Sequence, residues 1–251
     1  MKSDLIDESD QELLRNGYKI KKVGKNIEVG TLSVSQDEQV KQLKREKGEY
    51  VIINSRFVHL LGKDCEEQTQ KTLEKYLKKF VTNKKNVLVV GLGNPHLISD
   101  ALGTKVIEKI NIIGTERQRV SAISPDVFGN TGIRTSIIIE AICNKIKPTL
   151  VIIVDSLGTY SEDRLATSFQ ISTAGIVPGG ALDAENSLIN SASLKVPCVV
   201  LGVPLMLVVE KPISPLTEVL CPKNIEEYVE TCSIIISNAI NSVLHKTSAI
   251  I

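Results

Sequence analysis

The sequence predicts an α/β fold, a single domain in which a mostly parallel, mixed sheet is flanked by helices. Three observations lead to this class. Short aliphatic runs alternate with longer amphipathic stretches along most of the 251 residues. The aliphatic runs are continuous, which is typical of strands buried on both faces of a parallel sheet. Neither an internal repeat nor a low-complexity linker divides the chain, so one domain accounts for it.

The individual elements follow from local patterns. Residues 18–34 alternate around Gly24–Asn26, which predicts an antiparallel hairpin, and residues 50–54 predict a strand. Residues 65–81 carry apolar side chains at helical spacing, so we expect an amphipathic helix. Further along, the pattern predicts strands at 87–92, 119–123, 149–154 and 196–203, alternating with helices at 100–112, 131–146, 183–194 and 223–244. Residues 1–16 are polar and charged, and we expect them to form an arm ahead of a domain over 17–251.

The totals exclude several classes of function. The formal net charge is +1, from 30 basic and 29 acidic residues, so no strong field attracts nucleic acid or an anionic membrane. No apolar run is long enough to span a bilayer, and we expect neither nucleic acid nor a membrane as a partner. The five cysteines include no C-x-x-C pair, which favours reduced, mostly buried thiols in a cytoplasmic protein.

Two aspartates follow predicted parallel strands, Asp100 in VLVVGLGNPHLISDALG (87–103) and Asp155 in LVIIVDSLG (150–158). Ligands of open α/β sheets bind beyond the carboxyl ends of the strands, where both aspartates should lie. A helix after Asp100 favours its ionised form, and the aliphatic run before Asp155 favours its protonated form. Such a pair can share a proton and activate a water for amide hydrolysis. On spacing alone, a helix N-cap and a strand-end turn are the simpler explanation of the two residues.

The glycine-rich segment between these strands permits other interpretations. Gly91–Asn94 begins like a dinucleotide fingerprint, but His96 stands where the third glycine belongs. Val90–Pro95 also resembles the opening of peptidyl-tRNA hydrolases, which carry it near the N-terminus rather than in mid-chain. A tight turn after a strand is the structural alternative. The three histidines are too scattered for a triad or a metal site, and without a G-x-S-x-G motif a serine nucleophile has no support. We expect no metal and no cofactor.

Several segments together resemble the germination proteases of spore-forming bacteria, with order and spacing that agree across about residues 87–245. The similar segments are VVGLGNPHLISDALG (89–103), VSAISPDVFGNTGIRT (120–135), KPTLVIIVDSL (147–157), QISTAGIVPG (170–179) and VPCVVLGVP (196–204). Ser3-Asp4-Leu5 also echoes the family's N-terminal T-D-L-A. The chain departs from the family pattern at Asp126, where a glycine is expected, and at Arg134, where a glutamate is expected.

The resemblance implies a fold similar to that of hydrogenase-maturation endopeptidases. It implies an endopeptidase, aspartic but atypical, that degrades the small acid-soluble proteins coating spore DNA at germination, in the cytoplasm of the forespore or spore core. It also implies a homotetramer made as a zymogen, with residues 1–16 as a propeptide and 17–251 as the protease domain. Family catalytic aspartates carry over to Asp100 and Asp155.

The roles of the neighbouring residues stay open. Gly93, Asn94 and Thr131 are expected to position the peptide or polarise its carbonyl, or else only to make a turn and cap a helix. Two other functions stay open as well. One is a metal-dependent endopeptidase of the hydrogenase-maturation kind, and the other is a catalytically silent binder of spore proteins.

Overall fold

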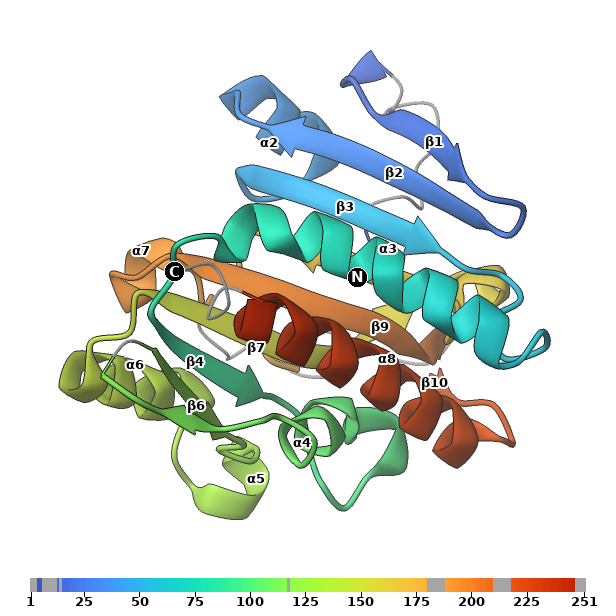
Figure 1. The fold of residues 1–251 in the computed structure, drawn as a ribbon. Helices are drawn as coiled ribbons and strands as arrows, with labels where there is room; N and C mark the ends of the chain where they lie inside the picture. Colours follow the sequence, from blue (N-terminus) through green and yellow to red (C-terminus); the bar gives the residue numbers. More distant parts are fainter. Residues whose placement is uncertain are drawn as a thin grey trace.

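A ten-stranded mixed sheet forms the centre of the molecule (Figure 1). The structure is a computed structural model and describes residues 4–5, 13, 15–116, 118–179, 188–209 and 218–246. The strands are β1 (Lys19–Val23), β2 (Ile27–Val34), β3 (Gly48–Asn54), β4 (Asn86–Gly91), β5 (Ile113–Gly114), β6 (Arg119–Ile123), β7 (Leu150–Thr159), β8 (Ser168–Ser172), β9 (Cys198–Val209) and β10 (Glu218–Leu220). They follow the order β1-β2-β3-β8-β9-β7-β4-β6-β5, with β10 on β9. The predicted α/β class is confirmed.

The centre of the sheet is parallel. Strands β9, β7, β4 and β6 are neighbours in this order, and each pairs in parallel with the next. Strand β7 is buried along its whole length, as its continuous aliphatic sequence predicts. It also extends past the predicted end at 154 to Thr159, whereas its pairing with β4 stops at Gly91 opposite Val154. One edge of β7 therefore continues beyond its neighbour, and this step in the sheet is where the candidate site lies.

Antiparallel strands complete the sheet on both sides. The predicted hairpin of residues 18–34 is formed by β1 and β2, and β3 joins it to the rest of the sheet. Strand β8 lies between β3 and β9 and is antiparallel to both. Strand β8 was not predicted, because its sequence, SFQIS, is short and more than half polar. The antiparallel part is thus larger than the predicted hairpin alone.

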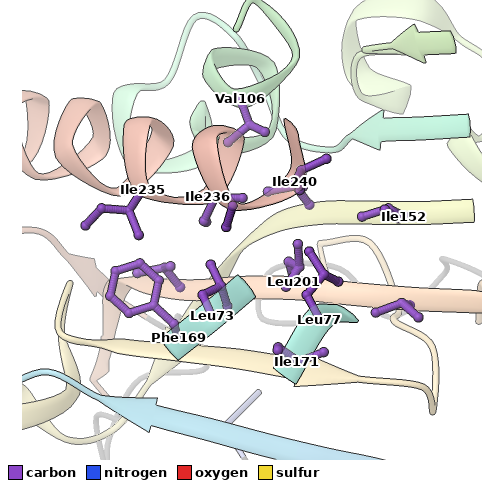
Figure 2. Close-up of a cluster of buried hydrophobic side chains, with 14 of the residues drawn as sticks. Leu73, Leu77, Val106, Ile152, Phe169, Ile171, Leu201, Ile235, Ile236 and Ile240 are labelled. Atoms are coloured by element: carbon purple, nitrogen blue, oxygen red, sulfur yellow. The ribbon is translucent and has the colours of Figure 1, made fainter. Parts of the chain in front are cut away.

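Helices α3 (Lys63–Val81), α4 (Leu102–Ile107) and α8 (Ile225–Lys246) cover one face of the sheet (Figure 1). Their apolar side chains pack on those of β7, β8 and β9 in the larger core cluster, part of which Figure 2 shows. Leu73 and Leu77 of α3 and Ile236 and Ile240 of α8 are all buried there. The apolar face of α8 is therefore covered by the domain's own core.

Helices α6 (Thr135–Ile146) and α7 (Ser191–Leu194) pack on the other face. Ile139 and Cys143 of α6 meet Val151 and Ile153 of β7 there. Because side chains alternate along a strand, β7 contributes to both cores, with Ile152 and Val154 on the first face. None of the helices in the described part of the chain is long and apolar enough to cross a membrane.

Three predicted helices are shorter in the structure. The 100–112 prediction becomes a 3-10 turn, η2 (Ile98–Asp100), followed by α4. The 131–146 prediction is divided into α5 (Phe128–Thr131) and α6, because Gly132 adopts a left-handed conformation with φ of 70°. Of the 183–194 prediction, residues 183–187 lie outside the described residues, and among residues 188–194 the helix is α7, which starts after the Asn190 cap.

Candidate active site

Asp155 lies where β7 extends past the end of β4. The last bond between these segments runs from Leu92 N to Val154 O, at 2.8 Å. The Asp155 side chain is only 5% exposed, and its Oδ1 accepts a bond of 2.9 Å from Ser156 N. Asp155 pairs with Gly202 of β9, and Gly202 pairs with Gln170 of β8, so the three residues form one row across the sheet. Residues paired in this way present their side chains on the same face, which puts Gln170 on the face of Asp155.

Asp100 is brought to the end of β4 by a tight loop. Gly93 has a φ of 108°, and a Cβ atom at this position would lie 1.8 Å from the backbone oxygen of Asp100. The loop therefore closes on itself through a residue without a side chain. Asn94 N then donates a bond of 2.8 Å to Asp100 Oδ2, which fixes the carboxylate against the start of the loop.

The two carboxyl groups differ in proton affinity. Burial raises the pKa of Asp100 to about 6, although the hydrogen bond from Asn94 N acts in the opposite direction and lowers it. Burial raises the pKa of Asp155 well above its ordinary value, and the charges of Asp100 and Asp4 raise it further. Both environments thus favour the protonated form of the carboxyl group, and the effect is larger at Asp155 than at Asp100.

The raised pKa of Asp155 agrees with the expectation from its aliphatic surroundings, whereas the pKa of Asp100 moves in the direction opposite to the expected one. We expected the dipole of the following helix to keep Asp100 ionised. Asp100 instead belongs to the 3-10 turn η2 ahead of the short α4, and burial moves its pKa upward. A pKa near 6 still leaves Asp100 mostly ionised at neutral pH, where it can accept a proton.

A third carboxylate, Asp4, was not predicted as part of this site. Gly158 N donates a bond of 2.7 Å to Asp4 Oδ2, and Asp4 N donates to Gly158 O at 3.3 Å. The only signal in the sequence was the resemblance of Ser3-Asp4-Leu5 to the family's N-terminal motif. Leu5 and Leu13 of the predicted arm are fully buried, so these described residues pack into the domain. The boundary at residue 16 and the removal of the arm stay predictions.

The predicted positioning residues fall into two groups. Gly93 and Asn94 belong to the loop that holds Asp100. Asn94 Oδ1 also accepts bonds from His96 N at 2.9 Å and from Asn130 Nδ2 at 3.4 Å, which ties this loop to the turn after β6. Thr131 lies in that turn, and its hydroxyl donates to the carbonyl oxygens of Val127 and Ile133. In the structure, the Thr131 hydroxyl therefore makes hydrogen bonds within this turn, as the turn-making alternative expects.

The residues around the site also bear on metal binding and on the departures from the family pattern. In the part of the chain that the structure describes, no group of three or more histidine, cysteine, aspartate or glutamate side chains is arranged to hold a metal ion.

Asp126, which stands where the family has glycine, adopts a left-handed φ of 64°. Its Oδ1 accepts bonds from Val127 N and Asn130 Nδ2, which stabilise the conformation that a glycine would adopt freely.

Comparisons with known proteins agree with the motifs. A family model described as germination protease matches residues 2–214. Germination proteases of Caldanaerobacter subterraneus subsp. tengcongensis and of Oceanobacillus iheyensis are each 34% identical to this chain, over 202 and 212 residues. These alignments cover 75% and 78% of this chain, but 62% and 57% of the relatives. The chain thus spans about three fifths of the length of the curated relatives that it matches.

Among solved structures, a [NiFe] hydrogenase maturation protease, HycI from Thermococcus kodakarensis KOD1, overlaps with a TM-score of 0.41 at 18% identity. The overlap covers 66% of this chain and 98% of that protein. Family membership rests instead on the family model, which extends over most of the sequence and includes both strand-end aspartates. The chain belongs to the germination protease family.

Proposed function

We propose that this chain is an endopeptidase that hydrolyses small acid-soluble, DNA-coating spore proteins at germination, with Asp100 and Asp155 activating one water. The observation that carries the proposal is a pair of carboxyl groups with different proton affinities at the carboxyl edge of parallel strands β4 and β7. Pairs of this kind supply a base and an acid to one reaction at the same pH. Membership of the germination protease family supports the class of reaction and of substrate.

In the proposed reaction, the ionised Asp100 takes a proton from a water as the water oxygen bonds to the peptide carbonyl carbon. The protonated Asp155 donates its proton to the carbonyl oxygen, which gives a neutral gem-diol intermediate. When the C–N bond breaks, Asp100 passes its proton to the leaving nitrogen, and a hydroxyl of the intermediate returns a proton to Asp155. Each turnover consumes one water and leaves both aspartates as they began.

The loops around Asp100 provide surfaces that suit a peptide. Leu97 and Ile98 precede Asp100 in its loop, and both side chains are more than two fifths exposed. Phe128 and Ile133 flank the turn that is tied to this loop through Asn130, and they are similarly exposed. Apolar side chains gathered at a polar centre are typical of substrate contacts. In the proposal, these four side chains hold the residues that flank the scissile bond.

The proposal also places the protein in the spore core as a homotetramer, and the family resemblance is its support. The apolar face of α8 offers no argument for assembly, because it packs into the larger core of the same chain. Ile235, Ile236 and Ile240 are 1% exposed or less within the single chain. Subunit contacts in the proposed tetramer therefore use other surfaces.

The test is cleavage of a purified small acid-soluble spore protein by the wild type and by Asp100→Asn and Asp155→Asn. The amide keeps the shape of the carboxyl group but cannot exchange its proton, so each variant should lose about 10²–10⁴-fold in kcat/KM with the fold intact. Asp163→Asn is the matched control, because Asp163 is an exposed aspartate on the 3-10 turn η3 (Glu162–Arg164). Wild-type turnover in either site variant would refute the two-aspartate mechanism.

The same assay separates the alternatives. Activity lost with a chelator and restored by a divalent metal would identify a metal-dependent endopeptidase. Binding of the spore protein without cleavage by the wild type would identify a silent binder. Cleavage that resists the chelator and requires both aspartates supports the proposal.

A further inference from the structure

We propose that the edge of β7 beyond Val154 binds the scissile segment of the substrate as an added strand, in the place that Asp4 occupies in the full chain. The inference rests on the proposed function, since it says how the substrate of that site is held. Its basis is the set of backbone groups along one edge of β7 and the segments that bond to them.

One edge of β7 loses its partner strand at Val154. The pairing of β4 with β7 ends at Gly91 and Val154, and the loop after β4 adds one bond, from Leu92 N to Val154 O at 2.8 Å. Strand β7 continues to Thr159, because its other edge stays paired with β9 as far as Leu207. In the described part of the chain, no strand pairs with the first edge past Val154. This stretch is therefore held extended, with one edge that can take another strand.

The backbone groups on this edge belong to alternate residues. Val151 N donates to Pro197 O, next to β9, so the odd-numbered residues of β7 direct their N–H and C=O groups toward β9. Successive residues of a strand direct these groups to opposite edges. Ser156 and Gly158 therefore direct theirs to the edge that Val154 shares with the loop after β4. An added strand would find bonding groups at every second residue, as between the strands of a sheet.

A segment of the chain itself is bonded to this edge. Asp4 N donates to Gly158 O at 3.3 Å, and Gly158 N donates to Asp4 Oδ2 at 2.7 Å. The first bond is of the kind that joins neighbouring strands, and in the second a carboxylate takes the place of a backbone acceptor. Gln170 Nε2 donates to Asp4 O at 3.2 Å, so the carbonyl of this residue is bonded as well as its N–H. The edge thus accommodates a peptide backbone in the chain as it stands.

The catalytic pair stands at the start of this edge. Asp155 lies between Val154 and Ser156, and Asp100 is held by the loop whose first N–H, that of Leu92, bonds to Val154 O. A strand added past Leu92 therefore begins beside both carboxyl groups, and its peptide bond next to Ser156 is the one that they can reach. Recognition through backbone groups requires an extended, unfolded segment and leaves the choice of side chains to the surrounding loops.

The edge is covered in the full chain. Asp155 and Ser156 are 5% and 6% exposed, and Leu5, next to Asp4, is fully buried. Substrate and the segment around Asp4 therefore compete for one place. The apparent affinity for substrate falls in proportion to the fraction of chains in which that place is free. Removal of residues 1–16, the predicted propeptide, would free the edge before any turnover.

The first test measures this competition in the full chain with Asp4→Ala, which removes the carboxylate bonded to Gly158 N. Binding of a fluorescein-labelled small acid-soluble spore protein is followed by anisotropy in an Asp100→Asn background, so that cleavage does not interfere. We expect Asp4→Ala to lower Kd on the order of threefold or more. In chains with Asp100 intact, KM should fall by a similar factor and kcat should change little, because saturating substrate has already displaced the segment. Asp163→Ala, on the turn η3, should change neither constant. An unchanged or raised Kd in Asp4→Ala would overturn the inference.

The second test asks whether the substrate pairs as a strand. In a short synthetic peptide around a cleavage site of the spore protein, each backbone N–H is replaced in turn by an N-methyl group, which removes one donor and keeps every side chain. Strand pairing predicts that KM rises on the order of tenfold at every second position and changes little at the positions between. Cleavage with effects that do not alternate would overturn the inference alone. A lower Kd in Asp4→Ala, in a chain that cleaves nothing, would support the inference and refute the proposed function.

Discussion

Replacement of Gly93 by alanine tests whether the loop around Asp100 is closed as the structure has it. Gly93 has a φ of 108°, in a region that disfavours any side chain. The new Cβ atom would also lie 1.8 Å from the backbone oxygen of Asp100 and 3.2 Å from its carboxyl carbon. The atom in the way belongs to the backbone, so a side-chain rotation cannot relieve the clash. The loop must move, and Asp100 must move with it.

The strained backbone and the steric clash together determine how much Gly93→Ala lowers the free energy of unfolding. A left-handed conformation costs a residue with a Cβ atom about 1–2 kcal/mol. Forcing an extra carbon into a packed site costs about 1–3 kcal/mol more. Gly93→Ala should therefore lower the free energy of unfolding by about 2–5 kcal/mol, and the Tm by roughly 5–20 °C for a chain of this size. Because Asp100 is displaced, kcat/KM should fall on the order of 10²-fold.

Two other glycines separate the causes. Gly17 has a left-handed φ of 88° with nothing within 4 Å of its added Cβ, so Gly17→Ala measures the conformational cost alone. Gly129, in α5, has neither a left-handed φ nor a close neighbour, and Gly129→Ala should be neutral or slightly stabilising. Urea denaturation of the three variants gives the comparison. If Gly93→Ala is no less stable than Gly17→Ala, the close approach to Asp100 is refuted.

Two further predictions concern stability and assembly. The raised pKa of Asp100 means that the folded chain binds a proton more tightly than the unfolded chain, so its contribution to stability is lost as pH rises from about 4 through about 6. Asp100→Asn should then be more stable than the wild type at pH 7, by on the order of 2 kcal/mol in the free energy of unfolding. Urea denaturation should show this difference vanish near pH 4. A gain in stability that does not depend on pH would contradict the prediction. For the proposed tetramer, light scattering should give four times the 27.4 kDa chain mass, and a mass near 27.4 kDa would show that the chain is a monomer.

The parallel centre and its two aspartates could be predicted because the signals are local. The aliphatic runs of β4 and β7 identify buried strands, and an aspartate beyond each run must then lie at the same edge of the sheet. Strand β8 carries a weaker signal. Phe169 and Ile171 face the larger core, while Ser168 and Gln170 alternate with them and are also buried. The polar pair is satisfied by distant partners, Asn54 Oδ1 and Asp4 O, which no local pattern reveals.

Asp4 could not be predicted for the same reason. Its carboxylate binds Gly158, 154 residues further along the chain, and residues 1–16 have no periodicity that would assign them to a sheet edge. The lengths of the helices were also beyond local reasoning. The interruption at Gly132 depends on one left-handed residue within an otherwise helical pattern, and helical spacing alone does not report it.

The burial of Asp155 argues against a purely structural role for the two aspartates. A carboxyl group that only ends a strand or caps a turn is most stable when it faces solvent or pairs with a cation. Asp155 is 5% exposed, and the charges that raise its pKa come from two further carboxylates. Such an arrangement opposes ionisation and makes the fold less stable as pH rises. Carboxyl groups held in this way are concentrated at sites where their proton takes part in chemistry, and a site that transfers a proton to a peptide carbonyl at neutral pH requires one of them.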